Sequence, residues 1–160
     1  MLYDVAAKTI KDVSSPSFDI EPGAPSFTNE GQRVLFTAGK RAYTEVFAYD
    51  LTSGSYTQLT QKKTISTTSA SRDGKVIVFA MDAPDSATEL YSTDPSFASP
   101  RRLTNINPQL AAIQQGATEV VTWKSGDGVE VEGVLLKPVG YTAGTRYPML
   151  VVAHGGPAGA

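Results

Sequence analysis

Short β-type runs separated by tight turns make up the first two thirds of the chain. RVLFTA at 33–38 and KVIVFA at 75–80 are rich in branched and aromatic residues, and each follows a turn signal, NEG or RDG. EVFAYD at 45–50 alternates, as a strand at the edge of a sheet does. Between residues 14 and 108, no stretch sustains the three- and four-residue apolar spacing of an amphipathic helix. The pattern predicts an all-β region.

The β-type runs recur in an internal repeat of about 44 residues. Residues 25–60 align with residues 69–104, and a partial third copy at 2–14 precedes them. The aligned positions are Gly31 with Gly74, Phe36 with Phe79, Glu45 with Glu89, and Leu59-Thr60 with Leu103-Thr104. A four-stranded unit of this length is typical of a propeller blade, which cannot cover both of its own faces and therefore stacks radially. The repeat predicts a partial β-propeller of two blades plus part of a third.

The last third of the chain follows a different pattern. EVVTWKS at 119–125 and VEVEGVLLKP at 129–138 are strand-like, and the GDG between them suits the turn of an antiparallel hairpin. RYPMLVVAHGG at 146–156 then combines a proline, a short apolar run and a glycine pair, which predicts a third strand buried on both faces. We expect residues 1–112 to form the C-terminal part of a propeller and residues 113–160 the start of an α/β domain.

Composition narrows the classes of function. With 41% hydrophobic and 19% charged residues and a formal net charge of -2, the chain has the profile of a soluble globular protein. The absence of a basic block argues against a nucleic-acid partner. Cysteine is absent, which excludes disulfides and a cysteine nucleophile, and a single histidine makes a metal site a poor prediction. The longest apolar run, MLVVA at 149–153, is too short to span a bilayer, and no signal-peptide pattern opens the chain.

The glycine pair after the predicted third strand is the most chemically suggestive feature. In α/β enzymes the chemistry lies where such strands end, and α/β-hydrolases place an oxyanion-hole N–H in a glycine-rich loop after the third strand. A Cβ would obstruct the approach of a substrate carbonyl to these amides, so glycine is needed. Gly155 and Gly156 are therefore candidates for an oxyanion-binding loop.

The stretch VTWKSGDGVEVEGVLLKPVGYTAGTRYPMLVVAHGGPAG resembles the propeller-to-hydrolase junction of the prolyl oligopeptidase family of serine peptidases, in particular its acylaminoacyl-peptidase and dipeptidyl-peptidase-like branch. The resemblance covers residues 119–159, and the preceding repeats agree with the family's architecture. In that family a β-propeller caps an α/β-hydrolase domain with a Ser, Asp, His triad and admits only short peptides or other small substrates. The resemblance implies no cofactor.

The resemblance also assigns roles to the loop. Gly156, with Gly155, would offer backbone N–H groups to the oxyanion, and Pro157 would shape the loop. His154 is expected to pack or hydrogen-bond in support of the loop rather than to act as the triad base. The family's nucleophile, Asp and His come later in the chain, so they are expected beyond residue 160. Ser53, Ser125 and Asp127 are expected to be turn residues. We therefore expect these 160 residues to be a piece of a peptidase that is inactive alone.

Two other functions remain open from the sequence. A β-propeller binding module with a β-rich extension would carry its function on the propeller surface and would not continue into a G-x-S-x-G motif. An esterase or lipase could use the same HGG loop, because a shared fold does not fix the substrate. The propeller repeats argue against the esterase.

Overall fold

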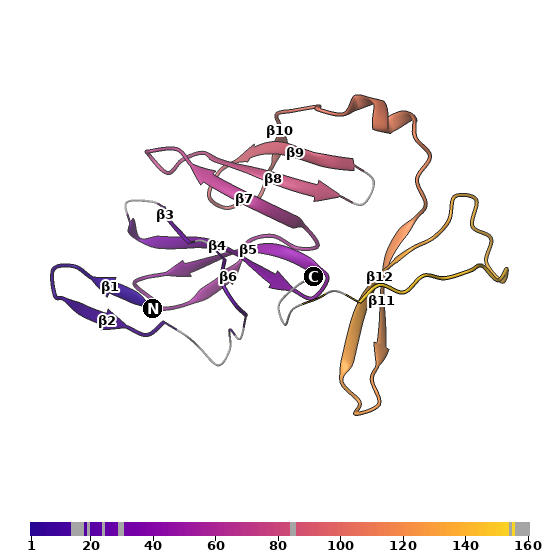
Figure 1. Cartoon of the computed structure of the whole chain (residues 1–160). Helices are drawn as coiled ribbons and strands as arrows, with labels where there is room; N and C mark the ends of the chain where they lie inside the picture. The colour runs from indigo at the N-terminus through magenta and orange to yellow at the C-terminus, as the bar shows by residue number, and fades with distance from the viewer. Residues whose placement is uncertain are drawn as a thin grey trace.

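The computed structural model describes residues 1–13, 18, 20–23, 25–28, 31–83, 86–153 and 155. Among the residues that the structure describes, the regular elements are mainly strands, as the sequence predicts, and a short 3-10 helix lies between the two regions (Figure 1). The elements are β1 (Leu2–Asp4), β2 (Thr9–Lys11), β3 (Ser26–Thr28), β4 (Arg33–Lys40), β5 (Tyr43–Asp50), β6 (Tyr56–Gln58), β7 (Thr64–Ala70), β8 (Ile77–Ala83), β9 (Ser86–Thr93), β10 (Arg101–Arg102), η2 (Pro108–Ala112), β11 (Thr118–Lys124) and β12 (Glu130–Leu136).

Each copy of the repeat folds into a four-stranded antiparallel unit. Strands β3, β4, β5 and β6 pair in chain order to form the first unit, and β7, β8, β9 and β10 pair in chain order to form the second. The units are joined at a single parallel bridge between Thr44 and Thr64. Two consecutive four-stranded antiparallel units confirm the prediction of a partial β-propeller.

The first unit is buried on both faces, which is the packing expected of a blade between two neighbours. Leu35, Val46 and Ala48 point toward the second unit, where they share a core with residues such as Ile77 and Phe79. The alternate residues of the same strands form a second core on the opposite face. That core contains Val34, Phe36, Ala38, Phe47 and Tyr49, with Leu2, Val13, Phe18, Ile20, Leu51 and Tyr56 packed against it.

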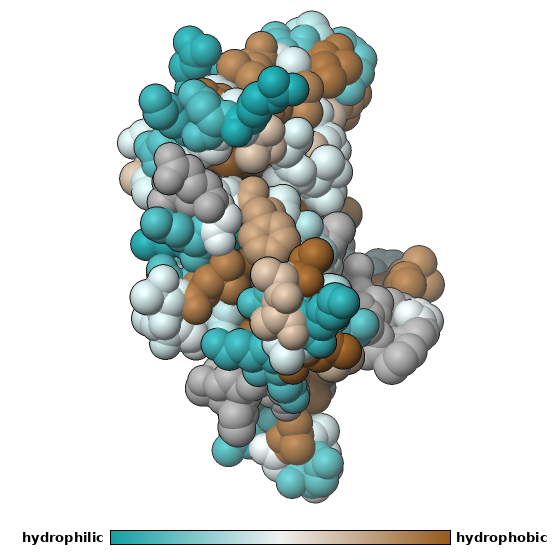
Figure 2. All heavy atoms as spheres, turned by 90° about the vertical axis from the view of Figure 1, so that its left-hand side faces the viewer, coloured by the Kyte–Doolittle hydropathy of each residue, from teal (hydrophilic) through white to brown (hydrophobic). Residues whose placement is uncertain are grey.

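The side of the molecule that carries the third, partial copy is less completely packed. Strands β1 and β2 form a two-stranded hairpin at this side (Figure 1). A cavity of about 400 Å³ lies between the N-terminal segment and the aromatic face of the first unit. Apolar side chains reach the surface on this face of the molecule (Figure 2), among them Tyr3 and Ile10.

A buried glutamate closes the first unit. Glu45 is only 2% exposed, and its carboxylate accepts a hydrogen bond from the Thr60 hydroxyl at 2.5 Å. The same hydroxyl accepts a hydrogen bond from the Val46 amide at 2.9 Å, and the Lys63 amide donates to the carboxylate at 3.2 Å. The chain that leaves β6 is thereby fixed against the start of β5. We call this arrangement the Glu–Thr clasp.

The second unit repeats the clasp at the equivalent residues. Glu89 is 3% exposed and accepts hydrogen bonds from the Thr104 hydroxyl and the Ile106 amide, while the Leu90 amide donates to Thr104 at 2.9 Å. Arg102 adds an ion pair of 2.7 Å. The hydrogen bond from Thr104 holds the pKa of Glu89 below its ordinary value, because it stabilises the ionised carboxylate. The clasp is therefore a recurring part of the blade.

The second region contains the predicted hairpin. Strands β11 and β12 pair antiparallel over their full length, from Thr118 opposite Leu136 to Lys124 opposite Glu130. The turn between them ends at Gly128, whose φ of 86° lies in the left-handed region that glycine adopts without strain.

The predicted third strand is not formed. Residues 149–153 belong to no strand, and Leu150 is 89% exposed. A strand buried on both faces needs a partner at its edge and helices over the sheet, and the described residues supply neither. Of the three hydrolase-domain strands expected from the sequence, the structure forms the first two, and the prediction of the third is wrong for this structure.

Candidate functional site

The predicted oxyanion loop lies mostly outside the described residues. Gly155 lies in a bend, and a Cβ added to it would meet nothing within 4 Å. His154, Gly156 and Pro157 are not among the residues that the structure describes. Their roles therefore stay predictions.

The turn residues lie where the sequence places them. The Asp127 carboxylate accepts hydrogen bonds from the Ser125 hydroxyl and the Val129 amide across the β11–β12 turn. Asp50 does the same with Ser53 after β5. The hydrogen bond from the Ser125 hydroxyl lowers the pKa of Asp127, and the Ser53 backbone amide is the main cause of the lowered pKa of Asp50. Ser53 and Ser125 therefore make turn hydrogen bonds, as the sequence predicts.

The described residues do not assemble a catalytic pair. The chain has one histidine, and it lies outside them, so no Ser–His contact can be built from what the structure describes. Within the same residues, no group of three or more His, Asp or Glu side chains is placed to hold a metal ion. Nor does this part of the chain contain a helix long and apolar enough to cross a membrane.

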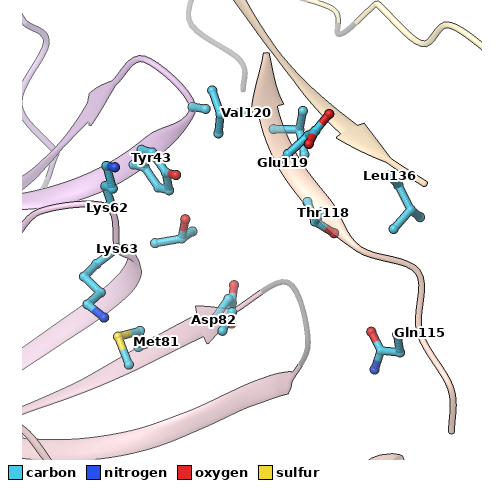
Figure 3. Close-up of a pocket in the computed structure, with 14 residues that line it drawn as sticks. Tyr43, Lys62, Lys63, Met81, Asp82, Gln115, Thr118, Glu119, Val120 and Leu136 are labelled. Atoms are coloured by element: carbon cyan, nitrogen blue, oxygen red, sulfur yellow. The ribbon is translucent and has the colours of Figure 1, made fainter. Parts of the chain in front are cut away.

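A cleft of about 530 Å³ lies where the propeller units face the β11–β12 hairpin (Figure 3). Both propeller units contribute to its wall, through the start of β5, the β6–β7 connection and the end of β8. The opposite wall comes from β11, β12 and the segment before β11. The lining residues are Ala42, Tyr43, Lys62, Lys63, Thr64, Met81, Asp82, Ala83, Gln115, Thr118, Glu119, Val120, Val134 and Leu136. We call this space the junction cleft.

An ionic contact fixes the hairpin against the first unit beside the junction cleft. Arg41 donates to Glu132 at 2.5 Å and lies 3.0 Å from Glu130, and the Ala42 amide donates to Glu132 at 3.3 Å. Arg41 has a φ of 58°, a left-handed conformation that aims the turn between β4 and β5 at the hairpin. The hydrogen bond to Glu132 raises the pKa of Arg41 further. The two regions are therefore held together by charge as well as by chain connection.

The two faces of the hairpin differ in what they contact. One face carries Val120, Val134 and Leu136 into the junction cleft. The other carries Trp123, whose ring lies over Gly133, where a Cβ would come within 3.0 Å of the ring. The hairpin therefore presents an apolar surface to the propeller.

The charges in the junction cleft are unevenly partnered. Glu119 pairs with Lys137 at 2.7 Å, and the hydrogen bond to the Glu119 carboxylate raises the pKa of Lys137. Asp82 accepts a hydrogen bond from the Thr88 hydroxyl. Within the part of the chain that the structure describes, the ammonium groups of Lys62 and Lys63 make no ion pair or hydrogen bond. They are the unpaired charges of the cleft.

Sequence reasoning missed both the Glu–Thr clasp and the junction cleft. The aligned Glu45 and Glu89, with threonine fifteen positions later in each copy, carried the signal for the clasp. The cleft had no local signal, because it forms from segments far apart in the chain.

The geometry defines a class of protein in which a propeller is followed directly by a second region that begins with a β-hairpin. Comparison with known proteins agrees with this class. The chain is 26% identical over 134 residues, or 83% of its length, to the uncharacterized peptidase YuxL of Bacillus subtilis. No family model matches the sequence.

Two solved structures share the fold. The acylaminoacyl peptidase of Pyrococcus horikoshii superposes with a TM-score of 0.62 at 21% identity over 77% of this chain. Dipeptidyl peptidase 4 of Porphyromonas gingivalis superposes with a TM-score of 0.65 at 17% identity over 91% of it. The chain spans about a fifth of the length of each of these three proteins. The resemblance to the prolyl oligopeptidase family of peptidases is confirmed.

Proposed function

We propose that this chain is the propeller-to-hydrolase junction of a serine peptidase that cleaves short peptides through an acyl-enzyme. One observation carries the proposal: along a span similar to a curated peptidase, two propeller units lead into a hairpin and then into an HGGP segment. Neither an isolated propeller nor a hydrolase without a propeller accounts for this order of parts. In this proposal the propeller part ends near residue 112, the last residue of η2, and the hydrolase part begins after it.

In this proposal the loop at the end of the chain stabilises the transition state. The amides of Gly156 and Gly155 would donate to the oxyanion that forms when a serine attacks the peptide carbonyl. His154 and Pro157 would hold the loop in shape. The serine, the aspartate and the triad histidine would come from sequence beyond residue 160, and these 160 residues alone would not turn over substrate, because nothing in them generates the tetrahedral species.

The propeller would limit the size of the substrate. A ring of blades over an active site excludes folded proteins and admits short peptides. The proposal therefore predicts amide hydrolysis that depends on substrate length.

Short-peptide p-nitroanilides, p-nitrophenyl esters and a folded protein should be compared as substrates for the protein that contains this chain. We expect release of p-nitroaniline from the peptides and no cleavage of the folded protein. Ester hydrolysis without any amide hydrolysis would replace the peptidase with an esterase. Turnover of neither substrate would favour a binding module.

A further inference from the structure

The junction cleft has the size and lining of a ligand site. Its volume of about 530 Å³ lies within the range of small-ligand pockets, about 300–1,000 Å³. Tyr43 and Met81 on the propeller side and Val134 and Leu136 on the hairpin side make its walls mainly apolar. Figure 3 shows Tyr43, Lys62, Lys63, Met81 and Asp82 on the propeller side, across the space from Thr118 and Leu136.

The lysines of the cleft are not required by the blade. In the first clasp Lys63 contributes only its backbone amide to Glu45, and in the second clasp the same contribution comes from the amide of Ile106. At the repeat offset of 44, the counterparts of Lys62 and Lys63 are Ile106 and Asn107, so the second copy builds the same structure without a cation at either position. The blade does not require the positive charges of Lys62 and Lys63, and both residues line the cleft.

Among the described residues, the positive charges of the cleft that have no ion pair are those of Lys62 and Lys63. Glu119 is paired with Lys137, and Arg41 is paired with both Glu130 and Glu132, which leaves one negative charge in excess beside the cleft. Among the residues that line the cleft itself, Asp82 is the remaining negative charge, against two lysines. A ligand with a negative end and an apolar body complements this arrangement.

We propose that the junction cleft binds the free C-terminal carboxylate of a short peptide, with Lys62 and Lys63 holding the carboxylate and the apolar walls holding the last side chain. The choice of a peptide rests on the proposed function. Binding at the cleft would favour substrates whose C-terminus lies a fixed distance from the scissile bond.

Binding should be measured by calorimetry on the protein that contains this chain, pretreated with a fluorophosphonate so that turnover does not contribute. The probes are the tripeptide Ala-Ala-Phe as the free acid, as the C-terminal amide and as the N-acetylated acid. We expect the amide to bind about 5- to 10-fold more weakly than the acid, as the loss of a charge-assisted contact implies. N-acetylation should leave the affinity of the acid unchanged.

Matched variants test whether Lys62 and Lys63 cause the difference in affinity between the acid and the amide. Lys62→Met with Lys63→Met should bring the affinity of the acid down to that of the amide, while Lys62→Arg with Lys63→Arg should retain the difference. Lys75→Met, an exposed lysine in the turn at the other end of β7, is the control and should change nothing. Circular dichroism checks that each variant keeps its β structure.

Two results would overturn the inference. The first is equal affinity for the acid and the amide in the unsubstituted protein. The second is a loss of binding on N-acetylation alone, which would make Asp82 the anchor for a peptide N-terminus. Neither result bears on the peptidase proposal, since peptide hydrolysis is measured separately. If the protein hydrolysed no peptide but still bound the acid more tightly than the amide, the carboxylate site would be supported and the peptidase proposal would be wrong.

Discussion

Replacement of Phe79 by alanine is expected to lower the free energy of unfolding by about 3–5 kcal/mol. Phe79 is 2% exposed in the core between the two propeller units, with ring centroids 5.6 Å from Tyr91 and 5.4 Å from Phe97. Truncation removes apolar contacts from both units and leaves a cavity that stiff strands cannot close. The effect should therefore reach the contact between the units as well as the second unit itself.

Urea unfolding followed by circular dichroism measures this change. Phe27→Ala is the matched control, because Phe27 lies on the short strand β3 and is 62% exposed. We expect the control to shift stability by less than about 0.5 kcal/mol. Equal effects of the two variants would mean that the propeller units do not share a core.

Thr60→Val is expected to cost about 2–4 kcal/mol, although valine has the same shape and suits a strand. The Thr60 hydroxyl both donates to Glu45 and accepts from the Val46 amide. Without it, a buried carboxylate oxygen and a buried amide each lose a partner, and leaving buried polar groups unpaired is costly. The result is measured by thermal or urea unfolding.

The control for this prediction is Thr57→Val on β6, where the threonine is exposed. It should be neutral or slightly stabilising, because valine favours strands. A double-mutant cycle with Glu45→Gln should show that the two substitutions are not additive, since they remove one network. Additive losses, or a neutral Thr60→Val, would show that the clasp does not hold the blade together.

The blades could be predicted from the sequence because each strand carries its own signal. Residues 33–38 and 45–50 have β-type composition, turns flank them, and the repeat doubles the evidence at Phe36 and Phe79. The hairpin of the second region was predictable for the same reason, from two strand-like runs and a GDG turn. Local chemistry determines these elements, so local reasoning finds them.

The third strand shows where local reasoning ends. Residues 149–153 have the composition of a buried strand, but a strand exists only where another pairs with it, and composition says nothing of the partner. The junction cleft could not be predicted from the sequence for a related reason. Lys62 and Leu136 are more than seventy positions apart in the chain and line one cleft only in the folded structure, where Arg41 and Glu132 also join the two regions.

The peptidase account is tested most directly by fluorophosphonate labelling of the protein that contains this chain, with the modified residue located by mass spectrometry. The account predicts stoichiometric labelling of one serine, in a G-x-S-x-G motif that follows the HGGP segment, and loss of peptide hydrolysis in proportion to the label. The account would be contradicted if the correctly folded protein that contains this chain took up no label, or if the label were found within residues 1–160.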